Sequence, residues 1–226
     1  MIILGVDTAL GACSAAVVKN GRVLAHDHRE MLRGHAEALA PMVEALMRAG
    51  RVTFSALDRI AVTTGPGTFT GQRVGIAFAR GLSLALKKPV IGVTTLETMA
   101  EEALAKSAGT AWALAAADAK RGEIYLAARS AKGDTLLVPE LIPLHAVAAH
   151  VAGLAKTHGR IVTLAGTAAE AAMPLLRAAG LEPLDSLVRQ PDAVFVASLA
   201  IHAPEGPLPK PLYLRAPDAK LPGGAA

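Results

Sequence analysis

Residues 65–75 hold the residue types whose spacing could do chemistry most directly, with the sequence GPGTFTGQRVG. They follow an apolar run at residues 60–64, which predicts a buried strand, and they lead into an expected helix at residues 70–86. Glycines at such a turn allow positive φ and close backbone approach, and a helix N-terminus offers N–H groups without partners. The segment could therefore bind an anion such as a phosphate.

The spacing of these glycines does not match a known phosphate loop. No Lys-Ser/Thr pair follows them, and Thr70 occupies the last glycine position of the G-x-G-x-x-G pattern. From the residues alone, a tight turn capped by Thr68 or Thr70 is favoured over an anion site. Gly71, Gly75 and Gly81 lie within the expected helix, where each glycine costs about 1 kcal/mol relative to alanine. Such small residues favour close packing of the helix. The sequence indicates equally that the helix packs on the chain's own sheet or on a helix of another protein.

The other candidates for chemistry are weaker. None of the 7 histidines has another histidine four residues later on a helix, the spacing of a helical metal site: His35 has Leu39 at that position. His26 and His28 do share one face of an expected strand. We expect all of them to be surface or capping histidines. The single cysteine, Cys13, lies in an apolar strand and is expected to be a buried small hydrophobe. We predict no catalytic residue and no metal site.

The pattern of elements predicts an α/β protein made of two similar units. Three strands, at residues 2–6, 12–18 and 23–28, are followed by a helix at 34–49, a strand, the helix at 70–86, a strand at 90–93 and a helix at 95–106. Residues 111–179 repeat the order of strand, strand, strand, helix, strand, helix, and a last helix is expected at 192–202. The expected division is residues 1–107, residues 108–203 and an extended tail rich in proline and glycine at 204–226.

Composition excludes several classes of protein. Of the 226 residues, 52% are hydrophobic and 3% aromatic, which indicates a packed globular core of small aliphatic side chains and no aromatic platform for single-stranded nucleic acid. One cysteine excludes an intrachain disulfide. No signal peptide and no membrane-spanning run is recognisable, so a cytoplasmic location is expected. The net charge of +4 lies entirely in residues 1–100, which is compatible with proximity to a polyanion.

Five motifs in order along the chain resemble those of the TsaB family, also called YeaZ. GPGTFTGQRVG at residues 65–75 is similar to the family's G-P-G-S-F-T-G-x-R-x-G, with Thr68 in place of its serine. The other four are the opening ILGVDT at 3–8 with ACS at 12–14, GVTTL at 92–96, DAKRGEIY at 118–125 and PLYLR at 211–215.

The resemblance implies an actin-like, Hsp70-like (ASKHA) fold of two tandem βββαβα domains. It also implies a non-catalytic subunit that a TsaD-type transferase and a TsaE-type ATPase require to make threonylcarbamoyladenosine, next to the anticodon of tRNAs that read codons beginning with A. tRNA would be contacted through the complex, and the chain alone would form a homodimer. No cofactor is expected to bind tightly to this chain. ATP or ADP would bind only at the junction between subunits of the complex.

The resemblance also implies roles for particular residues. The partner surface would lie on the first two helices, whose candidate residues are Leu39, Met42, Val43, Leu46, Gly71, Val74, Gly75 and Phe78. Vestigial nucleotide or phosphate contacts would come from Asp7, Thr8, Gly67 and Thr68. TsaD binds its metal through an H-x-x-x-H pair, and here the second position is Leu39, which favours a scaffold over an enzyme.

Two alternatives remain open from the sequence. The chain could be an independent actin-fold ATPase or kinase, or a peptidase as such relatives have been labelled, because Asp7, Thr8 and the glycines resemble parts of a nucleotide site. It could also be a homodimer with unrelated partners.

Overall fold

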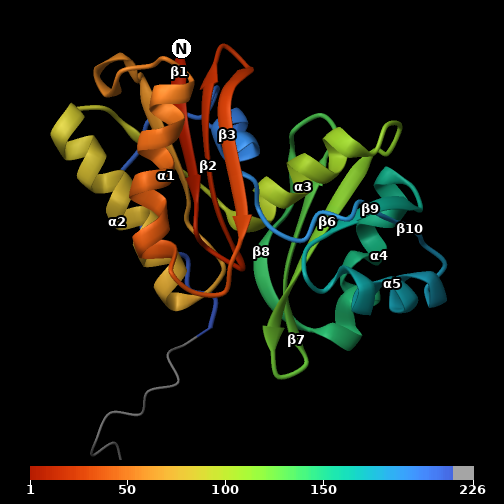
Figure 1. Ribbon diagram of the computed structural model, residues 1–226. Coiled ribbons are helices and arrows are strands. Elements are labelled where there is room, and N and C mark those ends of the chain that lie inside the picture. Colours follow the sequence, from red (N-terminus) through yellow and green to blue (C-terminus); the bar gives the residue numbers. More distant parts are fainter. Residues whose placement is uncertain (216–226) are drawn as a thin grey trace, which may run out of the picture.

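The computed structural model describes residues 1–215, which form two five-stranded sheets with helices on both faces (Figure 1). The first sheet has the order β3-β2-β1-β4-β5, and the second has the order β10-β9-β6-β7-β8. The strands of the first sheet are β1 (Ile2–Asp7), β2 (Ala12–Lys19), β3 (Arg22–Glu30), β4 (Arg59–Thr63) and β5 (Val90–Val93). Those of the second are β6 (Trp112–Lys120), β7 (Glu123–Ser130), β8 (Thr135–Pro143), β9 (Ile161–Ala165) and β10 (Glu182–Asp185).

Both sheets are built the same way. The first three strands of each unit form an antiparallel meander, and the last two pair in parallel after helical crossovers. The helices are α1 (His35–Ala49), α2 (Phe69–Leu86), α3 (Thr95–Lys106), α4 (Val147–His158), α5 (Ala169–Ala178) and α6 (Ala193–Leu199), with short 3-10 turns at Phe54–Ala56 and Leu144–Ala146. The predicted α/β class and repeated element order are therefore confirmed, with β10 added to the second unit.

Local signals in the sequence explain how several elements begin. Asn20 and Gly21 both have positive φ, at 50° and 79°, as the predicted hairpin turn between β2 and β3 requires. Thr68 caps α2 by accepting a hydrogen bond from the Gly71 N–H, which confirms the capped turn. Thr94 and Glu97 form a reciprocal capping box at the start of α3.

Helices α3 and α6 each cover the sheet of the other unit. Alternating side chains of β1, β2, β4 and β5 pack on α6, whereas α1 and α2 cover the opposite face of this sheet. In the second sheet, Ala113, Ala115 and Ala117 of β6 pack on α3, and α4 and α5 cover the other face. Each sheet thus receives part of its cover from a helix of the other unit, and the predicted division at residue 107 and residue 203 stays a prediction.

Residues 204–215 contain no helix or strand and run back along the first unit to the second. The Arg80 guanidinium donates to the Pro209 carbonyl oxygen at 2.6 Å, and the Leu212 N–H donates to the Thr64 carbonyl oxygen at 2.8 Å. Arg215 then reaches the β6–β7 turn, where it donates to the Ala119 carbonyl oxygen at 2.8 Å and pairs with Glu123. The rest of the predicted tail lies outside the described residues.

Cys13 is buried, as predicted, and burial raises the pKa of its thiol to about 11. No helix within residues 1–215 combines the length and apolar character that crossing a membrane demands.

Candidate functional site

The carboxyl ends of the parallel strands β1 and β4 bring Asp7 and Thr63 together. Asp7 is fully buried, and its Oδ1 accepts hydrogen bonds from the Thr63 hydroxyl and from the Ala9 N–H. Its Oδ2 has no hydrogen-bond partner among the described residues. Burial raises the pKa of this carboxyl to about 7, although the hydrogen bond from Thr63 acts in the opposite direction.

The glycine-rich segment packs directly on the turn that follows Asp7. The Thr68 N–H donates to the Ala9 carbonyl oxygen at 2.8 Å, and the Thr8 hydroxyl donates to the Gly71 carbonyl oxygen at 2.7 Å. The Gly71 N–H is in turn used by the Thr68 side chain. The structure thus gathers the predicted residues Asp7, Thr8, Gly67 and Thr68 around one turn, where the Thr8 hydroxyl and the N–H groups of Thr68 and Gly71 already have partners within the chain.

Close packing explains the glycines of this segment. A Cβ at Gly67 would lie 2.3 Å from the Ala9 carbonyl oxygen, and one at Gly71 would lie 2.1 Å from the Thr8 carbonyl oxygen. At Gly75 it would lie 2.7 Å from the Thr8 Oγ1. Gly71 and Gly75 are therefore buried against the chain's own β1–β2 turn, and their predicted contact with a partner stays a prediction.

A hollow of about 430 Å³ lies beside this turn, between the N-termini of α1 and α2. It is lined by Leu10, Leu32, Arg33, Gly34, His35, Ala36, Glu37, Thr68, Thr70, Gly71 and Val74. His35 opens α1 here, whereas Leu39, one turn later, is buried in the core and offers no metal-binding atom. The helical position that a second histidine would occupy is therefore part of the fold's interior.

The apolar stripe of α1 faces inward. Leu39, Met42, Val43 and Leu46 are at most 7% exposed and belong to the core between α1, α2 and the first sheet. These four side chains cover the outer face of the first sheet, and their predicted contact with a partner stays a prediction.

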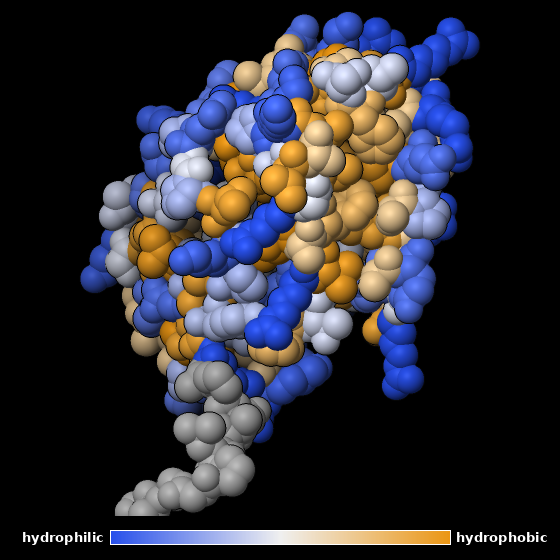
Figure 2. Space-filling model, turned by 90° about the vertical axis from the view of Figure 1, so that its left-hand side faces the viewer, coloured by the Kyte–Doolittle hydropathy of each residue, from blue (hydrophilic) through white to orange (hydrophobic). Residues whose placement is uncertain are grey.

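The outward face formed by α1 and α2 is nevertheless apolar. Most of its members are small or aliphatic, and α2 carries only two charged residues, both arginines, whereas α1 also exposes Glu37 and the ion pair of Glu44 with Arg48. Exposed residues are Ala40, Pro41, Ala45 and Ala49 on α1 and Ala77, Gly81, Leu84 and Ala85 on α2, with the predicted Val74 and Phe78 half-buried beside them. We call this set the α1–α2 face. Figure 2 views this side and shows apolar side chains gathered into a broad patch with hydrophilic residues at its rim.

Gly81 distinguishes this face from an ordinary helix surface. It lies inside α2, is exposed, and a Cβ there would meet no atom within 4 Å. No contact within residues 1–215 therefore accounts for a glycine that weakens the helix.

At the start of α2, an exposed aromatic pair joins the chain's C-terminal residues to the glycine-rich segment. The rings of Phe69 and Tyr213 stack with centroids 5.6 Å apart. The Arg73 guanidinium lies 3.6 Å from the centre of the Phe69 ring and donates to the Tyr213 hydroxyl at 2.8 Å. With Arg215 bound at the β6–β7 turn, three of the motifs quoted from the sequence come into contact in space.

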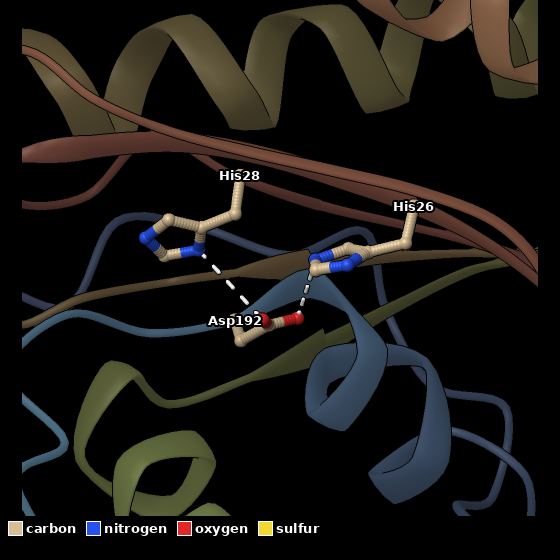
Figure 3. Close-up of side chains that lie close together, drawn as sticks. All are labelled: His26, His28 and Asp192. Atoms are coloured by element: carbon tan, nitrogen blue, oxygen red, sulfur yellow. Dashed lines mark ion pairs between the residues drawn. The ribbon is translucent and has the colours of Figure 1, made fainter.

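The structure also forms a cluster that sequence reasoning missed. His26 and His28 of β3 lie beside Asp192, the residue that caps α6 (Figure 3). The shared face of the two histidines was visible in the sequence, but the acid lies far along the chain. Only the packing of α6 on the first sheet brings it near.

Comparisons with known proteins agree with this geometry. The family model for TsaD, tRNA N6-adenosine threonylcarbamoyltransferase, matches residues 28–142. The chain is 42% identical over 127 residues to the tRNA threonylcarbamoyladenosine biosynthesis protein TsaB of Escherichia coli (strain K12), a stretch covering 56% of this chain and 54% of that protein. An uncharacterized protein of Mycobacterium tuberculosis is 34% identical over 96% of this chain and 93% of its own length.

Solved structures support the same grouping. YeaZ from Pseudomonas aeruginosa superimposes with a TM-score of 0.76 at 29% identity, over 94% of this chain and 99% of that one. The ROK hexokinase from Thermus thermophilus, at 19% identity and a TM-score of 0.52 over 88% and 98%, shares the fold. The predicted actin-like, ASKHA architecture is therefore confirmed.

Proposed function

Since the chain belongs to the TsaB (YeaZ) family of tRNA threonylcarbamoyladenosine biosynthesis proteins, we propose that it is a non-catalytic subunit of the modifying machinery. It works in the cytoplasm with a TsaD-type transferase and a TsaE-type ATPase, on the adenosine next to the anticodon of tRNAs that read codons beginning with A. tRNA is contacted through the complex. The matched stretch spans about half of the Escherichia coli relative, so these roles are proposed for this chain and rest on its own residues as well.

The α1–α2 face is the observation that carries the proposal. It is a largely apolar surface on two adjacent helices, its charges on α1 include the ion pair of Glu44 with Arg48, and Gly81 on α2 leaves room for a close approach. Interfaces have apolar centres depleted of charge, packed as densely as protein interiors. The face therefore suits a helix of the transferase, and the same surface would pair two copies of this chain when the transferase is absent.

The closed turn at Asp7 supports a role without catalysis. A nucleotide phosphate needs free N–H and hydroxyl donors, and the Thr8 hydroxyl and the N–H groups of Thr68 and Gly71 are used within the chain. The competing function, nucleotide hydrolysis or kinase activity by the isolated chain, would require this turn to open. Asp7, Thr8, Gly67 and Thr68 are accordingly proposed as remnants of a nucleotide site, and any ATP or ADP would sit at the junction with the transferase.

Reconstitution tests the proposal. The purified chain is mixed with the TsaD-type transferase, the TsaE-type ATPase, threonylcarbamoyl-adenylate and unmodified tRNA, and modified adenosine is measured. We expect modification to require this chain and the isolated chain to hydrolyse no ATP. Equal modification in its absence would refute the proposed role.

A further inference from the structure

His26, His28 and Asp192 converge on one point at the boundary between the two units. His26 and His28 alternate along β3 and so project from the same face of the strand, while Asp192 approaches from the loop that enters α6 (Figure 3). One ligand atom from each of the three residues can be chosen so that all lie within 4.8 Å of one another. The two imidazole rings are tilted by 57° with centroids 6.5 Å apart.

The distances in this cluster are near those between the ligands of a small metal ion. The His26 Nε2 lies 3.0 Å from the Asp192 Oδ1, and the His28 Nδ1 lies 3.7 Å from the Asp192 Oδ2. With ligand bonds of about 2.0–2.1 Å, tetrahedral geometry places neighbouring ligand atoms roughly 3.3 Å apart. The two observed distances, which run to different oxygens of the Asp192 carboxylate, lie on either side of that value, so the side chains would have to rearrange to surround a single ion.

A neighbouring carboxyl supplies an independent indication of a ligand. Glu102 of α3 is 6% exposed, and it lines the same hollow of about 280 Å³ as His28 and Asp192. Its Oε1 pairs with Lys106 at 2.7 Å, but its buried Oε2 has no partner among the described residues, and the same is true of the His28 Nδ1. A buried polar atom without a partner is costly, and a bound cation in this hollow would compensate both.

The Asp192 carboxylate is also fixed by a backbone hydrogen bond. Its Oδ1 accepts a hydrogen bond from the Val194 N–H at 2.8 Å, which fixes the side chain on the first turn of α6. Backbone hydrogen bonds of this kind orient carboxylates that bind metals. An ordinary ion pair between His26 and Asp192 would explain one contact, but it would explain neither the second histidine nor the unpartnered Glu102 oxygen.

We propose that His26, His28 and Asp192 form a binding site for a divalent transition-metal ion of the zinc type. Two imidazoles and one carboxylate suit Zn²⁺ and its first-row neighbours better than Mg²⁺ or Ca²⁺, which prefer oxygen ligands alone. Three protein ligands leave a fourth tetrahedral position for water, and Glu102 lines the hollow beside His28 and Asp192. The ion would join β3 to the start of α6, and the site is independent of the proposed role in tRNA modification.

Titration of the full-length, untagged, EDTA-treated protein with Zn²⁺ alone tests the site by calorimetry and by thermal unfolding. We expect one saturable site per chain and a melting temperature that rises with Zn²⁺ concentration, as binding to the folded state requires. His28→Gln should weaken Zn²⁺ binding by at least about tenfold. Asp192→Asn should do the same while keeping the capping oxygen, which covers the case in which the first variant folds poorly.

His150→Gln is the matched control. His150 pairs with Glu140 at 3.0 Å, like His26 with Asp192, but no third metal-binding residue within residues 1–215 joins that pair. This variant should bind Zn²⁺ as the wild type does. The proposal is overturned if the wild type binds no Zn²⁺, or if the folded His28→Gln and Asp192→Asn variants both bind it as tightly as the wild type.

Discussion

Substitution of Gly81 tests whether the α1–α2 face is a partner-binding surface or an ordinary exposed helix surface. In α2 this residue has helical backbone geometry and open space where a Cβ would stand. Gly81→Ala should therefore stabilise the isolated chain by about 1 kcal/mol through helix propensity alone. For a chain of this size that corresponds to a rise of roughly 2–4 °C in melting temperature.

Gly81→Leu should leave the isolated chain folded, because leucine is also a good helix former and its side chain meets no neighbour within the chain. At a closely packed interface the extra atoms would cost about 1–3 kcal/mol. The Kd for the TsaD-type transferase should then rise by roughly 5- to 150-fold. Thermal unfolding of each variant alone and titration of each with the transferase measure the two effects separately.

Gly153 provides the matched control. It is likewise exposed, lies inside α4, and would place a Cβ in open space, but it belongs to the second unit. Gly153→Leu should leave the affinity for the transferase unchanged. If Gly81→Leu binds as tightly as the wild type, or if both leucine variants weaken binding equally, the assignment of the α1–α2 face as the docking surface is refuted.

Two further predictions concern the turn at Asp7. Gly71→Ala should destabilise the chain by about 3 kcal/mol in urea unfolding, since its Cβ would clash with the Thr8 backbone; an unchanged midpoint would contradict the packing described. Because burial raises the pKa of Asp7 from 3.8 to about 7, the folded state binds more protons than the unfolded state between these values. Stability is therefore lost as pH rises through that window. Asp7→Asn removes this titration, so its stability relative to the wild type should increase by up to about 4 kcal/mol between roughly pH 4 and pH 8; a constant difference across this range would show that Asp7 titrates normally.

Elements with local signals could be predicted from the sequence. The turn at Asn20 and Gly21 needs positive φ at two residues, and the caps at Thr68 and Thr94 need only a hydroxyl before a helix. Strand β10 gave no such signal, because Glu182–Asp185 contains a proline and two acids and lies at the sheet edge, where pairing on one side suffices.

The α1–α2 face could not be predicted from the local pattern of apolar residues. The stripe from Leu39 to Leu46 indicated an amphipathic helix and its apolar face, but the same stripe can pack on its own sheet or on another protein. The structure places it inside, which leaves the second, weaker face of alanines and Gly81 for a partner. That face has no strong periodic signal, because alanine is common on exposed and buried helix surfaces alike.

The cluster at Asp192 depends on tertiary packing in the same way. His26 and His28 share a face by the alternation of a strand, yet nothing near them in sequence identifies their third neighbour. Asp192 comes next to the two histidines because α6 packs on the first sheet. The short apolar run of α6 gave no indication in the sequence that it would pack there.

The packing of α6 on the first sheet has a consequence for how the chain folds during synthesis. The face of the first sheet formed by Ile3, Ala16 and Ala61 is covered by α6 and the residues just after it, from Ala193 to Ala203. Its strands and outer helices therefore emerge from the ribosome long before their inner cover exists, and the exposed apolar face is open to wrong pairing in that interval. Contacts between the first and last parts of a chain are also slow to form. The two units are thus expected to complete folding together, late in synthesis, rather than one after the other.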